Sequence, residues 1–126
     1  MKPTYKLNNL ISACIKGVSK AYISKGAMET ARSDFNLNTQ DSVLGFIGNS
    51  GLESPSFINS NPWENNPNPE NLIMVDAYSF YSGSLYGYIA FFYQPETKRW
   101  IIKSFKRNNS LMRKKHFKSI IGGQYE

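Results

Sequence analysis

Tyrosines and basic residues gather at close spacing in two aromatic segments of the C-terminal part of the chain. Tyr86 and Tyr88 alternate in the first segment. Lys103, Lys106 and Arg107 follow in the second. A lysine or tyrosine whose pKa is lowered by neighbouring cations can act as a general base, and cations stabilise a charged phosphorane. These residue types suit cleavage of RNA by its own 2′-hydroxyl, a reaction that requires no metal.

Residues that most other catalytic and metal sites require are scarce. His116 is the single histidine and Cys14 the single cysteine, so no cluster of His, Cys and Asp has the spacing of metal ligands. The glycine pairs at 45–48 and 48–51 lack the lysine and the following Ser or Thr of a phosphate-binding loop. We therefore expect no metal and no cofactor, and any catalysis must use Lys, Arg, Tyr or Glu.

Charge is segregated along the chain, whose net charge is +6. Residues 1–32 hold six Lys or Arg and one acid, residues 33–97 hold seven acids and no Lys or Arg, and residues 98–126 hold nine Lys or Arg and one acid. Such segregation favours a polyanionic or acidic partner that meets one region of the surface. A solvated basic tail explains the same composition, so charge alone leaves both interpretations open.

A β-hairpin is expected to position the tyrosines and the lysines. Residues 85–93 are aromatic and apolar, residues 94–98 contain turn-forming types, and residues 99–105 return as a second strand. Side chains alternate between the two faces of a strand. Tyr86 and Tyr88 therefore share a face opposite the Leu, Ile and Phe residues of the same strand, and we expect both tyrosines to lie outward.

The second strand of the hairpin decides which cation joins the tyrosines. Regular alternation predicts one face with Trp100, Ile102, Ser104 and Lys106 and another with Arg99, Ile101, Lys103 and Phe105. Whether Lys103 or Lys106 lies beside the tyrosines depends on the register between the strands, which the residues leave open. An ordinary sheet surface without function is the alternative interpretation of these tyrosines.

Three helices are predicted before the strands. Apolar spacing places them over residues 4–17, 25–34 and 39–48. The capping candidates are Thr4 for the first helix, Ser24 for the second, Asn38 or Thr39 for the third, and Gly17 at the end of the first. Helices followed by strands favour an α+β fold, with N-terminal helices packed on one face of a C-terminal antiparallel sheet.

The remaining segments connect these elements. Residues 18–23 are expected to form only a brief extended passage, residues 48–71 a long loop rich in Gly, Ser, Asn and Pro, and residues 72–81 a further strand. The chain is expected to be a single domain over residues 1–126, in which residues 108–126 form a basic tail or, at 110–121, a final helix.

The chain carries no sign of membrane insertion or secretion. Its apolar runs are too short to span a bilayer, and its N-terminal residues lack the pattern of a signal peptide. The single cysteine also agrees with a reducing compartment. We expect a cytoplasmic location and no membrane partner.

Several short motifs follow one another between Tyr5 and Arg107. They are Leu7-x-x-Leu-Ile with a closing Gly17, Phe46-Ile-Gly48, Glu53-Ser-Pro-Ser-Phe57, Trp63, Leu85-Tyr86 and Ile102-Lys-Ser-Phe-Lys106. In order and spacing they resemble the motifs of MqsR-family toxins, the ribonuclease halves of type II toxin–antitoxin systems. The resemblance implies a RelE-like fold.

The resemblance also implies a cofactor-independent endoribonuclease, an mRNA interferase that cleaves mRNA, inhibits translation and is neutralised by a cognate antitoxin. Tyr86 and Lys106 match catalytic positions of the family. Glu64 follows Trp63 where the family has a glutamine, and Asn59 stands near the position of an early catalytic lysine. Glu64 can serve as a base in its own right, or it can be an exposed loop glutamate.

Binding roles complete this hypothesis. Arg99, Lys103 and Arg107 would hold phosphate, and Trp63 or Tyr88 would stack on a base. The antitoxin would cover the same basic face or the loop beside it. Two alternatives remain open: a non-catalytic module of the same fold that binds RNA, the ribosome or a protein, and a small interaction protein whose basic tail binds an acidic partner.

Overall fold

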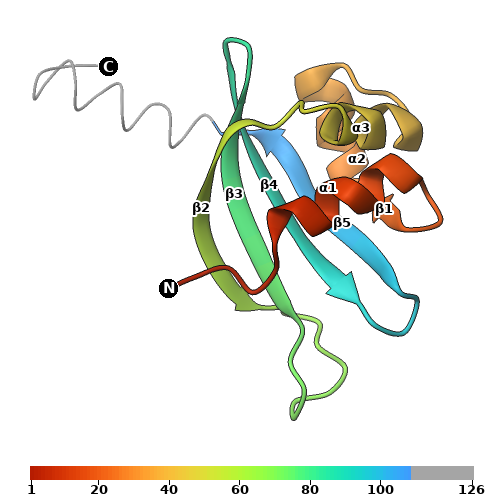
Figure 1. Cartoon of the computed structure of the whole chain (residues 1–126), viewed down its shortest axis with the longest axis vertical. Helices are drawn as coiled ribbons and strands as arrows, with labels where there is room; N and C mark the ends of the chain where they lie inside the picture. The colour runs from red at the N-terminus through yellow and green to blue at the C-terminus, as the bar shows by residue number, and fades with distance from the viewer. Residues whose placement is uncertain (109–126) are drawn as a thin grey trace, which may run out of the picture.

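The computed structural model describes residues 1–108, so the expected tail or helix beyond residue 108 lies outside the described residues. The elements follow one another (Figure 1) as α1 (Leu7–Lys16), β1 (Ala21–Ile23), α2 (Lys25–Phe35), α3 (Gln40–Gly48), β2 (Glu53–Pro62), β3 (Met74–Ser82), β4 (Leu85–Gln94) and β5 (Arg99–Arg107). Three helices and one sheet confirm the α+β class. Within residues 1–108, no helix is long and apolar enough to cross a membrane.

The five strands form one mixed sheet in the order β1-β5-β4-β3-β2. Neighbouring strands from β2 to β5 are antiparallel, whereas β1 is parallel to β5. The N–H of Trp100 donates to the carbonyl of Lys20 at 2.9 Å, and the N–H of Ser24 donates to the carbonyl of Ile102 at 3.0 Å. The strands from β2 to β5 are antiparallel as expected, and the extended passage after α1 adds a parallel edge strand that makes the whole sheet mixed.

The polar segment between α3 and β3 contains a strand, although residues 48–71 are expected to be a loop. β2 occupies Glu53–Pro62 and pairs with β3. It is an edge strand with mostly exposed side chains, so it lacks the apolar alternation by which strands are recognised. Pro55 lies where the register shifts between Glu53 and Ser56, and proline is tolerated at such bulges and at edges.

Local capping residues define the ends of the helices. Gly17 ends α1 with φ 96°, in the region that favours glycine. The side chain of Ser24 accepts a hydrogen bond from the N–H of Ala27 at the start of α2. Thr39 and Ser42 form a reciprocal capping box at α3. These three caps confirm the predictions for Gly17, Ser24 and Thr39.

The predicted cap at Thr4 is wrong. α1 begins at Leu7 after Lys6, whose side chain makes no capping hydrogen bond. The backbone N–H groups of Thr4 and Tyr5 instead donate to the two carboxylate oxygens of Asp76 on β3, at 3.1 and 2.9 Å. Asp76 is 0% exposed. This buried carboxylate holds the N-terminal segment on the sheet before the helix begins.

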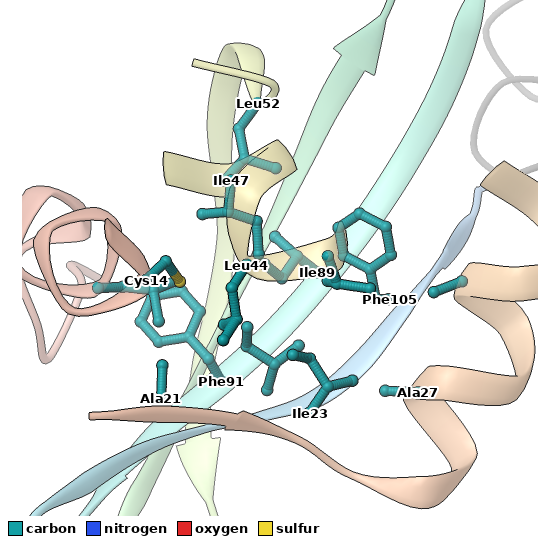
Figure 2. Close-up of a cluster of buried hydrophobic side chains, with 14 of the residues drawn as sticks. Cys14, Ala21, Ile23, Ala27, Leu44, Ile47, Leu52, Ile89, Phe91 and Phe105 are labelled. Carbon is teal, nitrogen blue, oxygen red and sulfur yellow. The ribbon is translucent and has the colours of Figure 1, made fainter. Parts of the chain in front are cut away.

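Side chains from all three helices pack against one face of the sheet and form the hydrophobic core with it (Figure 2). Cys14 of α1 and Leu44 of α3 belong to the same buried cluster as Ile89, Phe91 and Phe105 of the two central strands. Close packing of this kind fixes the strands beneath the helices. Tyr88 and Ala90, which alternate with Ile89 and Phe91 along β4, therefore lie on the face away from the helices.

Candidate functional site

The sheet face away from the helices carries a polar hollow of about 210 Å³, which we call the open-face hollow. Tyr88 and Ala90 line it and alternate along β4 with the core residues Ile89 and Phe91, so the hollow lies opposite the helices. The polar and aromatic part of its lining is Asn59, Asn61, Trp63, Glu64, Tyr88, Lys103 and Ser104. Strands β2, β4 and β5 and the β2–β3 connection therefore all contribute.

A bulge at Lys103 brings two neighbouring residues of β5 to this hollow. Ala90 pairs with Ser104 and Phe91 with Ile102, so Lys103 is an extra residue in the ladder. The bulge shifts the alternation by one residue. Ile102 belongs to the core, whereas Lys103 and Ser104 both line the hollow. The expectation that Ile102 and Ser104 share one face is therefore wrong.

Tyr88 and Lys106 lie directly opposite each other in the ladder between β4 and β5. The Lys106 ammonium lies 5.6 Å from the centre of the Tyr88 ring, a cation–π geometry. Lys106 is exposed and Tyr88 is partly buried. The register, which the residues alone leave open, thus pairs Lys106 with Tyr88. Ser79 completes the row, because it pairs with Tyr88 from the β3 side.

Glu64 forms an ion pair with Lys103 across the hollow. Its Oε1 atom lies 3.3 Å from Nζ of Lys103, and the Glu64 side chain is 72% exposed against 36% for Lys103. Pairs this exposed contribute about 1 kcal/mol or less to stability, because solvent screens them. The lysine charge is therefore partly neutralised in the free protein and accessible to a competing anion.

The β2–β3 connection holds Trp63 and Glu64 in place. The side chain of Asn66 donates to the carbonyls of Trp63 and Ile73 at 2.8 and 3.1 Å and accepts from the N–H of Ile73 at 2.7 Å. The Trp63 ring stacks on Phe92 with centroids 4.6 Å apart and planes at 28°. Trp63 is thereby fixed as one wall of the hollow.

Tyr86 lies two residues before Tyr88 on the same strand, but it is not among the lining residues. Only 4% of its surface is exposed, and its ring packs against Tyr81 with centroids 4.8 Å apart. Tyr86 therefore follows Tyr88 in the alternation of β4 but, unlike Tyr88, is buried. Of the two, Tyr88 is the one that the structure brings together with Lys106.

Arg99 and Arg107 lie at opposite ends of β5 and do not line the hollow. The Arg99 guanidinium stacks over the ring of Tyr22 at 4.8 Å. The backbone N–H of Arg107 donates to a carboxylate oxygen of Asp34 on α2 at 3.0 Å. The structure therefore brings together Trp63, Glu64, Tyr88, Lys103 and Lys106 and leaves the two arginines outside this group.

Asn61 and Ser104 line the hollow, although the sequence did not predict them as site residues. Asn59 also lines it, and was noted in the sequence only as a departure from a family motif. Asn59 and Asn61 are two residues apart, the spacing of one strand face. That signal was available, but proline and glycine nearby favour a loop. Ser104 was expected on one face with Lys106, but its place beside Lys103 depends on the bulge, which is set by pairing with β4.

Other reactive groups lie elsewhere or are absent from the described part. Cys14 is buried in the core, and desolvation raises the pKa of its thiol to about 12. A thiol held protonated in this way is a poor nucleophile. Within residues 1–108, no group of three or more His, Cys, Asp or Glu is arranged to hold a metal ion.

No protein-family model, no curated protein and no solved structure matches the chain. The site must therefore be interpreted from its own chemistry. It offers a carboxylate, an ammonium group, a phenol and a fixed indole around a polar hollow, and a second ammonium group, that of Lys106, beside the phenol ring. Such a set can bind a phosphate, contact an unstacked base and exchange protons.

Proposed function

We propose that this protein is a toxin of the MqsR type with a RelE-like fold, which cleaves mRNA as an endoribonuclease and is neutralised by a cognate antitoxin in the cytoplasm. The observation that carries the proposal is the pairing of Lys106 with Tyr88 beside Glu64 and Lys103 at one polar hollow. The α+β class, in which four of the five strands follow the three helices, supports the implied fold.

The proposed reaction is attack by the 2′-hydroxyl of the RNA on its neighbouring phosphate. The Glu64 carboxylate accepts the hydroxyl proton and the 2′ oxygen bonds to phosphorus. The bond from phosphorus to the 5′ oxygen then breaks, and the tyrosine hydroxyl protonates that oxygen. The products are a 2′,3′-cyclic phosphate and a free 5′-hydroxyl. Lys103 and Lys106 stabilise the negative charge on the phosphorane.

Binding groups surround this centre in the proposal. Trp63 and Tyr88 contact unstacked bases, and Arg99 and Arg107 guide the phosphates that enter and leave along β5. The resemblance assigns the tyrosine role to Tyr86, whereas exposure and the pairing with Lys106 favour Tyr88. Variants of both tyrosines therefore belong in the test.

Growth arrest and RNA cleavage test the proposal together. Expression of the wild-type protein should arrest growth of the host cells, and purified protein should cleave single-stranded RNA in the presence of EDTA. Lys106→Ala should lower cleavage by about 100-fold or more, the usual contribution of a proton-transfer or charge-stabilising group. The change should leave the fold intact, because an exposed cation–π contact contributes only about 0.5 kcal/mol.

Controls separate chemistry from general charge. Lys25→Ala removes an exposed lysine on α2, away from the hollow, and should cleave like wild type. Tyr88→Phe should impair cleavage more than Tyr86→Phe. Arrest and cleavage that both survive Lys106→Ala and the two tyrosine variants would sink the assignment.

A second function, RNA binding without cleavage, is favoured by one observation. The ion pair with Glu64 occupies Lys103, the lysine that lines the hollow. Protein that binds single-stranded RNA with a steep salt dependence, yet never cleaves it, would support this alternative.

A further inference from the structure

A second hollow region lies along α1, on the other side of the β4–β5 hairpin. Two cavities of about 430 and 410 Å³ share Asn9, Tyr93 and Trp100 in their linings. Trp100 packs against the core beneath the helices, so this region shares no residue with the open-face hollow. We call it the α1 groove, defined by Lys6, Asn9, Lys16, Lys20, Tyr93, Lys98 and Trp100.

The polar residues of α1 run along the groove in one stripe. Lys6, Asn9, Ser12 and Lys16 follow at spacings of three or four residues, which place them on one side of a helix. α1 has ten residues, or about 15 Å at 1.5 Å per residue. The groove therefore offers cations at both ends of a track about as long as five extended residues.

Four exposed lysines surround the groove, namely Lys6, Lys16, Lys20 and Lys98. Within residues 1–108, the one ion pair joins Lys103 to Glu64, so no carboxylate there neutralises these lysines. Two acids lie on flanking elements. Asp76 is buried and already accepts two backbone hydrogen bonds, and Glu96 is exposed in the turn before Lys98. The groove is positively charged.

The floor of the groove is aromatic, but its rings are already packed against each other. Trp100 contacts Tyr5 and Tyr93 edge to face, with centroids 5.2 Å apart in both pairs. Stacking on a nucleic-acid base requires a ring face that is free. Packed rings instead provide an apolar surface for aliphatic or aromatic side chains, bordered by lysines that pair with carboxylates.

We propose that the α1 groove binds an extended acidic peptide segment of a partner protein. Apolar side chains of the peptide contact the floor at Tyr93 and Trp100, and its Asp or Glu residues pair with the lysines at the rim. The lysines favour an anionic partner, and the packed aromatic floor favours the apolar side chains of a peptide over the bases of a nucleic acid. This surface is independent of the proposed cleavage site.

Lys98 allows a clean substitution. Its φ of 56° lies in the left-handed region, which asparagine tolerates better than lysine. Lys98→Asn therefore removes a charge from the groove without straining the turn. Lys16→Ala removes a second charge at the end of α1, where the side chain is exposed.

The test measures binding of a fluorescent peptide that alternates Glu and Leu to the full chain. The peptide should bind wild type, and a peptide that alternates Gln and Leu should bind more weakly. The double variant Lys16→Ala/Lys98→Asn should lose about tenfold in affinity, since each exposed pair contributes up to about fivefold. Lys25→Ala, which removes one lysine charge away from the groove and so matches each single variant, should bind like wild type.

A second probe separates a peptide surface from a nucleic-acid surface. Single-stranded oligouridine should bind the double variant as tightly as it binds Lys25→Ala. Loss of RNA affinity in the double variant alone would assign the groove to nucleic acid and overturn the proposal. So would absence of saturable peptide binding, or peptide binding that the double variant leaves unchanged. RNA cleavage, measured in parallel, reports on the open-face hollow separately.

Discussion

Replacing Glu64 with glutamine removes one negative charge from the open-face hollow while keeping the size of the side chain. Glu64 Oε1 lies 3.3 Å from Nζ of Lys103, and the glutamate is 72% exposed. The pair therefore contributes less than about 1 kcal/mol to stability. We expect the melting temperature of Glu64→Gln to change by no more than about 5 °C.

RNA binding should tighten in this variant. A phosphate bound at Lys103 would lie about 6 Å from the Glu64 carboxylate, where like charges in a water-like dielectric repel by about 0.7 kcal/mol. Removing the carboxylate should raise the affinity for RNA about threefold. Because Lys103 also becomes free to pair with phosphate, the increase should be largest at low salt.

RNA cleavage should change in the opposite direction. A general base contributes about 100- to 10,000-fold to the rate of a proton transfer. If Glu64 accepts the proton of the 2′-hydroxyl, the cleavage rate of Glu64→Gln should fall by about 100-fold or more, although RNA binding improves. This opposition of binding and rate distinguishes a catalytic carboxylate from one that only screens Lys103.

Two measurements separate these effects. Fluorescence anisotropy with a 2′-O-methyl oligonucleotide, which cannot attack its own phosphate, gives the affinity without cleavage. Single-turnover cleavage of the matching RNA gives the rate. Glu70→Gln is the matched control, since Glu70 is an exposed glutamate in the same β2–β3 connection but does not line the hollow.

Specific outcomes would refute parts of this reasoning. Unchanged cleavage with tighter binding would show that Glu64 is not the base and that it only competes for Lys103. Weaker RNA binding in Glu64→Gln than in Glu70→Gln would show that phosphate does not bind at Lys103, and the proposed site would lose its main anion contact.

The remaining predictions concern stability and are measured by thermal or chemical unfolding. Gly87→Ala should lower stability by about 2 kcal/mol or more, because a Cβ there would collide with the ring of Phe80; Gly26→Ala, which meets no atom within 4 Å in α2, should change stability little or raise it by up to about 1 kcal/mol. Asp76→Asn should cost about 1.5–3 kcal/mol, since the amide NH2 cannot accept from one of the two backbone N–H groups and the other hydrogen bond loses the charge of its acceptor. Burial raises the pKa of the Cys14 thiol from 9.0 to about 12, so the unfolded chain loses the thiol proton at lower pH than the folded chain. The free energy of unfolding should therefore fall between pH 9 and 12, by about 1.4 kcal/mol per pH unit from this group, and Cys14→Ala should make that fall less steep.

Local features of the sequence were sufficient for much of the fold. The caps at Gly17, Ser24 and Thr39 depend on residues within one helical turn, and all three are present as predicted. The α+β order and the hairpin from β4 to β5 follow from side-chain periods and turn residues. Each of these signals lies within a short stretch of chain.

Other features depended on partners that are distant in the sequence. The sequence of β2 has the composition of a loop, because most side chains of this edge strand are exposed and need not be apolar. Pairing with β3 makes the segment a strand. Thr4 appears to be a helix cap until Asp76, 72 residues away, accepts its N–H. The parallel strand β1 likewise exists only through β5.

The candidate site shows the same division. The residues alone supplied the types, tyrosine, lysine and glutamate, and the expectation that catalysis does not depend on a histidine or cysteine cluster, because the chain has one residue of each kind. Tertiary structure decided that Lys106 faces Tyr88, that Tyr86 is buried, and that Glu64 reaches Lys103. The reason is physical: side-chain period is a property of one strand, whereas register, bulges and loop closure are set by contacts between strands.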